Sequence, residues 1–180
     1  MKAKQAKDLI KLVDPQLLVA EPPDPRYVGS PFEHLKVMQS KVKGSRFEMI
    51  AQDVFKKLGY TVTKHLLSDV TDKKKKTDYD FVANGERYEE KGGTLNKNTD
   101  VFSFMQIRPK QTYDRLLFVM FYPHELVMMY MEKQLLLDLI ASGALGASQH
   151  GGKDGDSGTY VYYGNKETLL ELGAKHIEYP

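Results

Sequence analysis

The sequence predicts a single α/β domain. Amphipathic helical patterns alternate with short strand patterns along the chain. Two of the strand patterns are separated by Asn84-Gly85, a dipeptide typical of a tight β-hairpin. The 180 residues, 41% apolar and 28% charged, can build one hydrophobic core of ordinary composition. We expect an N-terminal helical arm with a proline-rich connector at residues 1–40, and the main domain at residues 41–180.

The composition excludes several kinds of site. The chain has no Cys, which excludes disulfides, thiolate zinc sites and cysteine nucleophiles. A net charge of +2, from 26 basic and 24 acidic side chains, means that any surface for nucleic acid must come from local clustering. The first apolar stretch is broken by charges and a proline, so we expect no signal peptide, no membrane partner and a cytoplasmic location.

The N-terminal part of the chain predicts two different segments. Residues 2–18 have the apolar spacing of an amphipathic helix. Residues 21–31 contain four prolines, which argue against any regular element there and favour a connector.

The first helix of the main domain is predicted over residues 45–58. Ser45 and Glu48 have the spacing of a capping box, and Gly59 is a typical helix end. The apolar positions of this helix recur at helical spacing and predict one buried stripe: Phe47, Ile50, Ala51, Val54 and Leu58.

The remaining elements follow from β-branched, aromatic and apolar runs between turn signals. Strands are predicted at 60–65, 116–122, 126–131 and 159–163, helices at 133–141 and 166–173, and a glycine-rich loop at 142–158.

The Asn84-Gly85 hairpin is the strongest local signal. With a two-residue turn, the numbers of paired residues sum to 169, so Phe81 faces Tyr88, Asp80 faces Glu89 and Asp78 faces Lys91. Because strand side chains alternate, one face is expected to be charged and the other aromatic. The charged face would carry Asp78, Asp80, Glu89 and Lys91, and the aromatic face Tyr79, Phe81 and Tyr88.

The charged face suits a divalent cation. Mg²⁺ prefers oxygen ligands and keeps several waters, so the carboxylates of Asp80 and Glu89 with the backbone carbonyl of Glu90 would suffice. Lys91 could hold the attacking water and help to deprotonate it. The alternative is a surface hairpin of solvated charge pairs. Two observations favour the cation site over this alternative. The directly opposed acids Asp80 and Glu89 would destabilise a hairpin that binds no cation, and Gly92-Gly93 would let a ligand approach the strand.

Asp80 followed by Glu89-Glu90-Lys91 resembles the D…(D/E)xK core of the PD-(D/E)xK nuclease superfamily. Residues 44–62 look like its first helix and strand, with Glu48 at the position of a helix acid that often completes the metal site. Tyr79 stands where the superfamily usually has a proline, which leaves open whether Asp78 or Asp80 is the ligand. The resemblance, over about residues 44–110, implies a restriction-endonuclease-like core: a mixed central β-sheet flanked by helices. It also implies a DNA nuclease that uses Mg²⁺, with Mn²⁺ as a substitute.

Within the superfamily the chain looks most similar to small type II restriction endonucleases, on the stretches 104–119 and 148–153. This resemblance implies a homodimer acting on double-stranded DNA. Six side chains are candidate DNA contacts: Gln106, Arg108, Lys110, Gln149, His150 and Lys153. The lysine run 73–76 is a further candidate for phosphate contacts. The glycines before Lys153 lack phosphate-loop spacing, so no nucleotide cofactor is expected.

Two other functions remain open from the sequence. A Holliday junction resolvase or a repair nuclease would have a similar opening helix and the same acidic core. A non-catalytic DNA-binding module on the same fold is the alternative from a different class, although it would usually have lost one of the acids.

Overall fold

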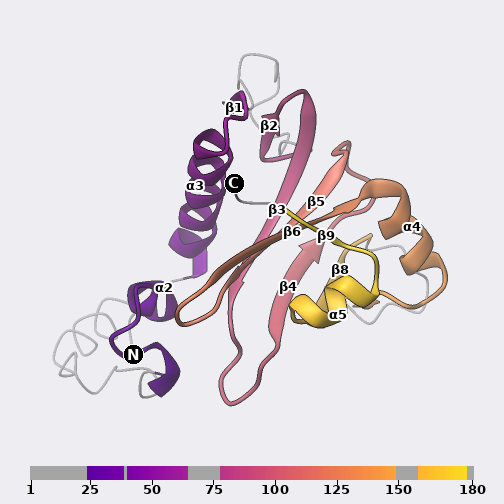
Figure 1. Ribbon diagram of the computed structural model, residues 1–180. Coiled ribbons are helices and arrows are strands. Elements are labelled where there is room, and N and C mark those ends of the chain that lie inside the picture. The colour runs from indigo at the N-terminus through magenta and orange to yellow at the C-terminus, as the bar shows by residue number, and fades with distance from the viewer. Residues whose placement is uncertain (1–23, 39, 65–77, 149–157, 178–180) are drawn as a thin grey trace, which may run out of the picture.

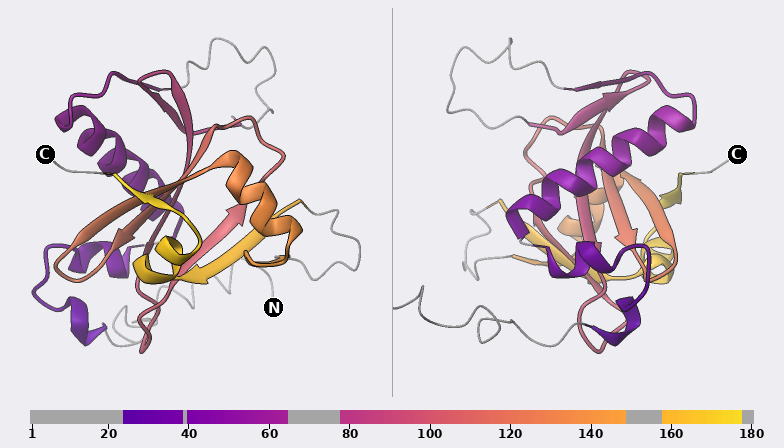
Figure 2. Two further views of the ribbon diagram at one scale, coloured as in Figure 1. Left: turned by 45° about the vertical axis from the view of Figure 1, so that its right-hand side comes forward. Right: turned by 90° about the vertical axis from the view of Figure 1, so that its left-hand side faces the viewer.

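The computed structural model describes residues 24–38, 40–64, 78–148 and 158–177, which form a three-layer α/β fold (Figure 1). A six-stranded sheet is the middle layer. Helix α3 (Ser40–Lys57) covers one face of this sheet. The other face is covered by a three-stranded sheet with helices α4 (Lys133–Ala141) and α5 (Lys166–Glu171). Figure 2 shows α3 and the α4–α5 pair on opposite sides of the sheet.

The central sheet is mixed, as the resemblance implied. In spatial order its strands are β1 (Val62–Lys64), β2 (Phe81–Ala83), β3 (Glu86–Thr94), β5 (Arg115–Phe121), β6 (Leu126–Glu132) and β9 (Lys175–His176). Strands β3 and β5 run parallel, and the other neighbours run antiparallel. The predicted α/β class with a mixed sheet and flanking helices is therefore confirmed.

Two apolar clusters hold the layers together. Between α3 and the sheet, Phe47, Ala51 and Phe55 pack against the apolar side chains of β2, β3 and β5. On the opposite face, β5 and β6 pack against α4, α5 and the second sheet. That sheet consists of β4 (Phe102–Ile107), β8 (Tyr160–Gly164) and β7 (Ala147–Ser148). Strand β5 is buried on both faces because it contributes to both clusters, which explains its continuous apolar run.

Helix α3 begins five residues earlier than predicted. Ser45 lies inside the helix, so the predicted capping box of Ser45 with Glu48 is wrong. Lys41 and Lys43 favour helix, and the helix continues through Gly44 although glycine is unfavourable there. The predicted C-terminal end is confirmed: Gly59 has a φ of 84° and donates its amide to the carbonyl of Lys56.

The predicted hairpin register is confirmed. Phe81 pairs with Tyr88, Val82 with Arg87 and Ala83 with Glu86. The turn residues Asn84 and Gly85 have φ values of 49° and 86°, as a two-residue turn of this kind requires. The rings of Phe81 and Tyr88 stack on the α3 side with centroids 5.3 Å apart.

The register does not continue past Phe81. The amide of Asp80 donates to the carbonyl of Tyr88 (2.8 Å), so the predicted pairs Asp80–Glu89 and Asp78–Lys91 are not formed. Asp78 instead accepts a hydrogen bond from the Thr112 hydroxyl. Tyr79 packs into the cluster on the face away from α3, not with Phe81. The chain leaves the ladder at this point, and the alternation rule holds only while strands remain paired.

The other elements agree with the prediction to within a few residues, namely β1, β5, β6, α4, β8 and α5. Strands β4, β7 and β9 were missed. Strand β4 is interrupted by an irregularity between Phe104 and Ile107, which breaks the alternation that would have revealed it. Strands β7 and β9 have two residues each and are defined only by their neighbours.

The proline-rich connector contains more structure than predicted. Pro25–Tyr27 form a short 3-10 turn (η2), and Glu33–Val37 form helix α2. The buried Tyr27 hydroxyl donates to the carbonyl of Phe121 (2.5 Å) and accepts from the amide of Leu95 (2.9 Å). These bonds tie the segment to the sheet. The helix predicted at 2–18 lies outside the described residues. Among the helices that the structure describes, none combines the length and apolar character needed to span a membrane.

Candidate active site

The site lies along an edge of β3. Strand β2 pairs with only the first three residues of β3, whereas β5 accompanies β3 from Tyr88 to Thr94. In the described part of the chain, no strand pairs with the β2 side of β3 beyond Tyr88. Asp80 covers the start of this open edge: its Oδ2 accepts a hydrogen bond of 2.6 Å from the amide of Glu90. The break in the ladder therefore brings the Asp80 carboxylate to the backbone of β3.

Glu89 and Lys91 form an ion pair on one face of β3. Lys91 Nζ lies 2.5 Å from Glu89 Oε1, and the two side chains are 16% and 6% exposed. Burial raises the pKa of Glu89, Lys91 opposes this rise, and the nearby Asp80 adds to it. Three predicted catalytic residues, Asp80, Glu89 and Lys91, are therefore close enough to act on one another electrostatically.

The side chain of Glu90 lies on the opposite face of β3, towards α3. A Cβ built on Gly92 would lie 2.5 Å from Glu90 Oε1 and 2.5 Å from Phe47 Cδ2, so Gly92 leaves the space that this carboxyl occupies. Glu90 Oε1 is buried and accepts no hydrogen bond from any described residue. Burial raises the pKa of Glu90 well above its usual range; Lys91 opposes this, and Asp80, Glu48 and Glu89 add to it. From the sequence, only the backbone carbonyl of Glu90 was predicted to take part in the site.

Glu48 approaches the site from α3. Its Oε1 accepts a hydrogen bond of 2.7 Å from the buried side chain of Gln52. Glu48 is near enough to Glu90 to raise the pKa of that carboxyl. Glu48 therefore approaches the carboxylates of the site from the face of β3 on which Glu90 lies.

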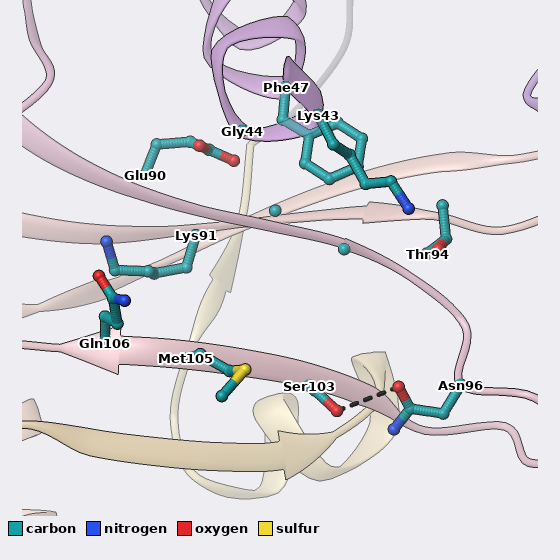
Figure 3. Close-up of a pocket in the computed structure, with 12 residues that line it drawn as sticks. Lys43, Gly44, Phe47, Glu90, Lys91, Thr94, Asn96, Ser103, Met105 and Gln106 are labelled. Carbon is teal, nitrogen blue, oxygen red and sulfur yellow. Dashed lines mark hydrogen bonds between the residues drawn. The ribbon is translucent and has the colours of Figure 1, made fainter. Parts of the chain in front are cut away.

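Two of the predicted DNA contacts border the site. The irregularity in β4 leaves Met105 and Gln106 both exposed, and Gln106 has a φ of 58°. In Figure 3 the amide of Gln106 lies beside the ammonium of Lys91. Arg108 donates to Gln106 Oε1 (3.0 Å), and its charge lowers the pKa of Glu89.

Of the remaining predicted contacts, the structure describes only one, and it does not line the site. Lys110 is exposed on the segment that follows β4. Gln149, His150, Lys153 and the lysine run 73–76 lie outside the described residues.

A cavity of about 500 Å³ continues from the site along the edge of β3 (Figure 3). It lies between the start of α3, strand β3 and strand β4. Lys91 and Gln106 line one end, and Lys43, Thr94 and Asn96 are also in its wall. Such a volume falls within the range of small-molecule and cofactor sites.

The donor atoms suit a hard divalent cation. Within the described ranges, no three His, Asp or Glu side chains are arranged to hold a metal ion. The predicted set needs fewer side chains, because Mg²⁺ keeps several waters and takes only one or two carboxylates from a protein. Asp80 and Glu89, together with the Glu90 carbonyl, are all oxygen donors. The charge of Asp80 raises the pKa of Glu89, and a cation bound between the two carboxylates would offset this repulsion.

Two residues at this site, Tyr113 and Lys43, were not predicted from the sequence. Tyr113 is buried, its hydroxyl has no hydrogen-bond partner among the described residues, and burial, followed by the charge of Glu89, raises its pKa. Lys43 lines the cavity from α3. Neither residue belongs to a motif, and only the folded arrangement brings them to β3.

Comparison with known proteins leaves the family open. No protein-family model matches the chain, and no curated protein matches it in sequence. Among solved structures, the bacterial homing endonuclease I-Ssp6803I is similar with a TM-score of 0.39 and 16% identity, over 55% of this chain and 69% of that one. This similarity is too low to support an activity. We therefore base the function on the residues of the site.

Proposed function

We propose that this protein is a metal-dependent endonuclease that hydrolyses phosphodiester bonds in double-stranded DNA. The observation that supports it most is the grouping of Asp80, Glu89 and Lys91 at the open edge of β3, with Lys91 held 2.5 Å from Glu89. A basic group and two acids beside a cavity are the side chains that metal-assisted phosphodiester hydrolysis needs.

Each residue has a distinct role in this proposal. Asp80, Glu89 and the Glu90 carbonyl hold Mg²⁺, or Mn²⁺ as a substitute. The bound ion supplies charge stabilisation at the scissile phosphate and a more acidic water. Lys91 Nζ orients the attacking water and is itself positioned by Glu89. Glu48 supports waters on the α3 side.

The finer proposal is a type II restriction endonuclease that acts as a homodimer. It follows from the resemblance of residues 104–119 and 148–153 and assigns base and backbone contacts to Gln106, Arg108 and the loop around His150. A homodimer would place one β3 site on each strand of a palindrome. Mapping the ends of digested plasmid tests this: defined ends at one repeated sequence are expected.

Cleavage of plasmid DNA in Mg²⁺ tests the coarser proposal. The wild-type protein should cut, and a chelator should abolish cutting. Asp80→Asn keeps an oxygen that can accept from the Glu90 amide but removes the charge, so a loss of at least about 10²-fold is expected with the fold retained. Lys91→Ala should lose at least as much. The matched control is Asp78→Asn, since Asp78 is exposed and bonded to Thr112; it should cut normally.

The outcomes separate the alternatives. Wild-type rates in Asp80→Asn or Lys91→Ala contradict the proposed site. DNA that is shifted in a gel but never cut by the wild-type protein supports a non-catalytic binding module. Preferential cutting of a four-way junction over linear duplex, with little dependence on sequence, supports a resolvase.

A further inference from the structure

Lys43 is a half-buried cation that forms no ion pair with any described residue. It projects from α3 into the wall of the 500 Å³ cavity, and its Nζ donates to the backbone carbonyl of Lys36 at 3.2 Å. No described carboxylate lies within ion-pair distance of it. Burial lowers the pKa of Lys43, and the charge of Lys36 lowers it further.

Lys36, a neighbouring lysine, differs from Lys43 because it has a carboxylate partner. Lys36 lies 3.5 Å from the buried carboxylate of Asp24 and also donates to the carbonyl of Leu95. Among the described residues, the partner of Lys43 is a backbone carbonyl and not a carboxylate. A partly buried ammonium without an anion costs free energy, and proteins usually pair such a group. An anionic ligand in the cavity would provide the missing partner.

Phe47 separates Lys43 from the carboxyl group of Glu90. In Figure 3 its ring stands between the Glu90 carboxyl and the Lys43 ammonium. Lys43 points instead towards Thr94, at the end of the cavity away from Lys91. The cavity wall between the two lysines is the Gly92-Gly93 backbone, which has no side chains to obstruct a ligand.

The distance along β3 indicates which anion fits. Lys91 and Thr94 are three residues apart, or about 10 Å of extended strand. Successive phosphates of one B-DNA strand advance by about 3.4 Å along the helix axis, so such a site lies within about three nucleotides of the bond that is cut.

We infer that the cavity binds the DNA backbone next to the scissile bond, with Lys43 as the counter-charge of a phosphate one to three nucleotides away. This inference rests on the proposed nuclease function and adds a substrate-positioning residue to it. The Gly92-Gly93 backbone and the polar side chains of Thr94 and Ser103 line the part of the cavity through which the DNA strand would run.

Binding of a labelled duplex that contains the mapped cleavage site tests this inference. Anisotropy is measured without divalent metal, so that cleavage does not interfere. Lys43→Met should reduce the slope of log affinity against log salt by about one, which is a loss of roughly tenfold at about 0.1 M salt. Lys43→Arg should keep the slope. Lys57→Met is the matched control because Lys57 is exposed on the same helix and does not line the cavity; it should leave binding unchanged.

A phosphate scan makes the test independent of the variant's folding. Single phosphates up to three nucleotides on either side of the cut are replaced by neutral methylphosphonates. One replacement should weaken binding roughly tenfold for the wild-type protein and for Lys57→Met, but not for Lys43→Met. If no replacement weakens wild-type binding, or if Lys43→Met keeps the wild-type slope, the role of Lys43 is overturned while cleavage still supports the nuclease. If the wild-type protein neither binds nor cuts DNA, both proposals fall.

Discussion

At the scale of single residues, the site depends on how two neighbouring glutamates point to opposite faces of β3. Glu89 pairs with Lys91 on one face, while Glu90 is buried on the other beside Phe47. The backbone between them carries the carbonyl that we assign to the metal. Space for Glu90 exists only because residue 92 has no side chain.

Gly92→Ala should therefore destabilise the protein. The added Cβ would meet Glu90 Oε1 and two atoms of Phe47 at 2.5–2.8 Å, and overpacking of this kind costs about 1–3 kcal/mol. Gly93→Ala is the control on the next residue, because its nearest neighbour would be an ordinary 3.5 Å contact with Phe102. Urea unfolding of both variants measures the difference. Equal stabilities would show that the α3 face of β3 can relax around a methyl group.

At the scale of elements, the hairpin and α3 are specified by local chemistry. The Asn84-Gly85 turn sets the register of β2 and β3, and apolar spacing sets the buried face of α3. The register in turn decides that Tyr88 and Glu90 face α3 while Glu89 and Lys91 face away. A change at the turn would therefore reach the site through the strand.

Two glycine substitutions should have opposite effects on stability. A Cβ on Gly85 or on Gly44 would meet no atom within 4 Å, so neither substitution creates a steric clash with a neighbouring residue. Gly85 has a φ of 86°, where alanine costs roughly 1–2 kcal/mol. Gly44 lies within α3, where alanine should add about 0.5–1 kcal/mol. Thermal unfolding of the two variants checks both signs, and destabilisation of similar size in both would contradict the explanation by φ.

At the scale of the whole molecule, residues 24–38 are attached to the sheet by charge as well as by apolar packing. Arg26 pairs with the buried Asp24 and also donates to the carbonyls of Asn96 and Thr99, in the connection between β3 and β4. Tyr27 and Leu35 enter the two apolar clusters. This segment therefore supports the loop that leads from the site to β4.

The Asp24–Arg26 pair should make stability depend on acid pH. The Arg26 guanidinium lowers the pKa of Asp24 from 3.8 to about 2, against the effect of burial. A lowered pKa in the folded state contributes stability above pH 3.8 that is lost as the pH falls to about 2. The contribution is at most about 2.5 kcal/mol. Asp24→Asn should therefore destabilise the protein at pH 7 by more than it does at pH 2, as measured by urea unfolding at both values. The same loss at both pH values would contradict the ionic explanation.

The sequence by itself determined the features that depend on neighbours in the chain. The hairpin register, the end of α3 at Gly59, the strands β5 and β6 and the placement of Glu89 and Lys91 on one face of β3 follow from turn chemistry and periodicity, which act over a few residues. Only the tertiary structure decided the position of Asp80, the buried side of Glu90 and the approach of Glu48, Lys43 and Tyr113. These depend on where the ladder ends and which layers meet across β3, and no spacing along the chain encodes contacts between segments that only packing brings together.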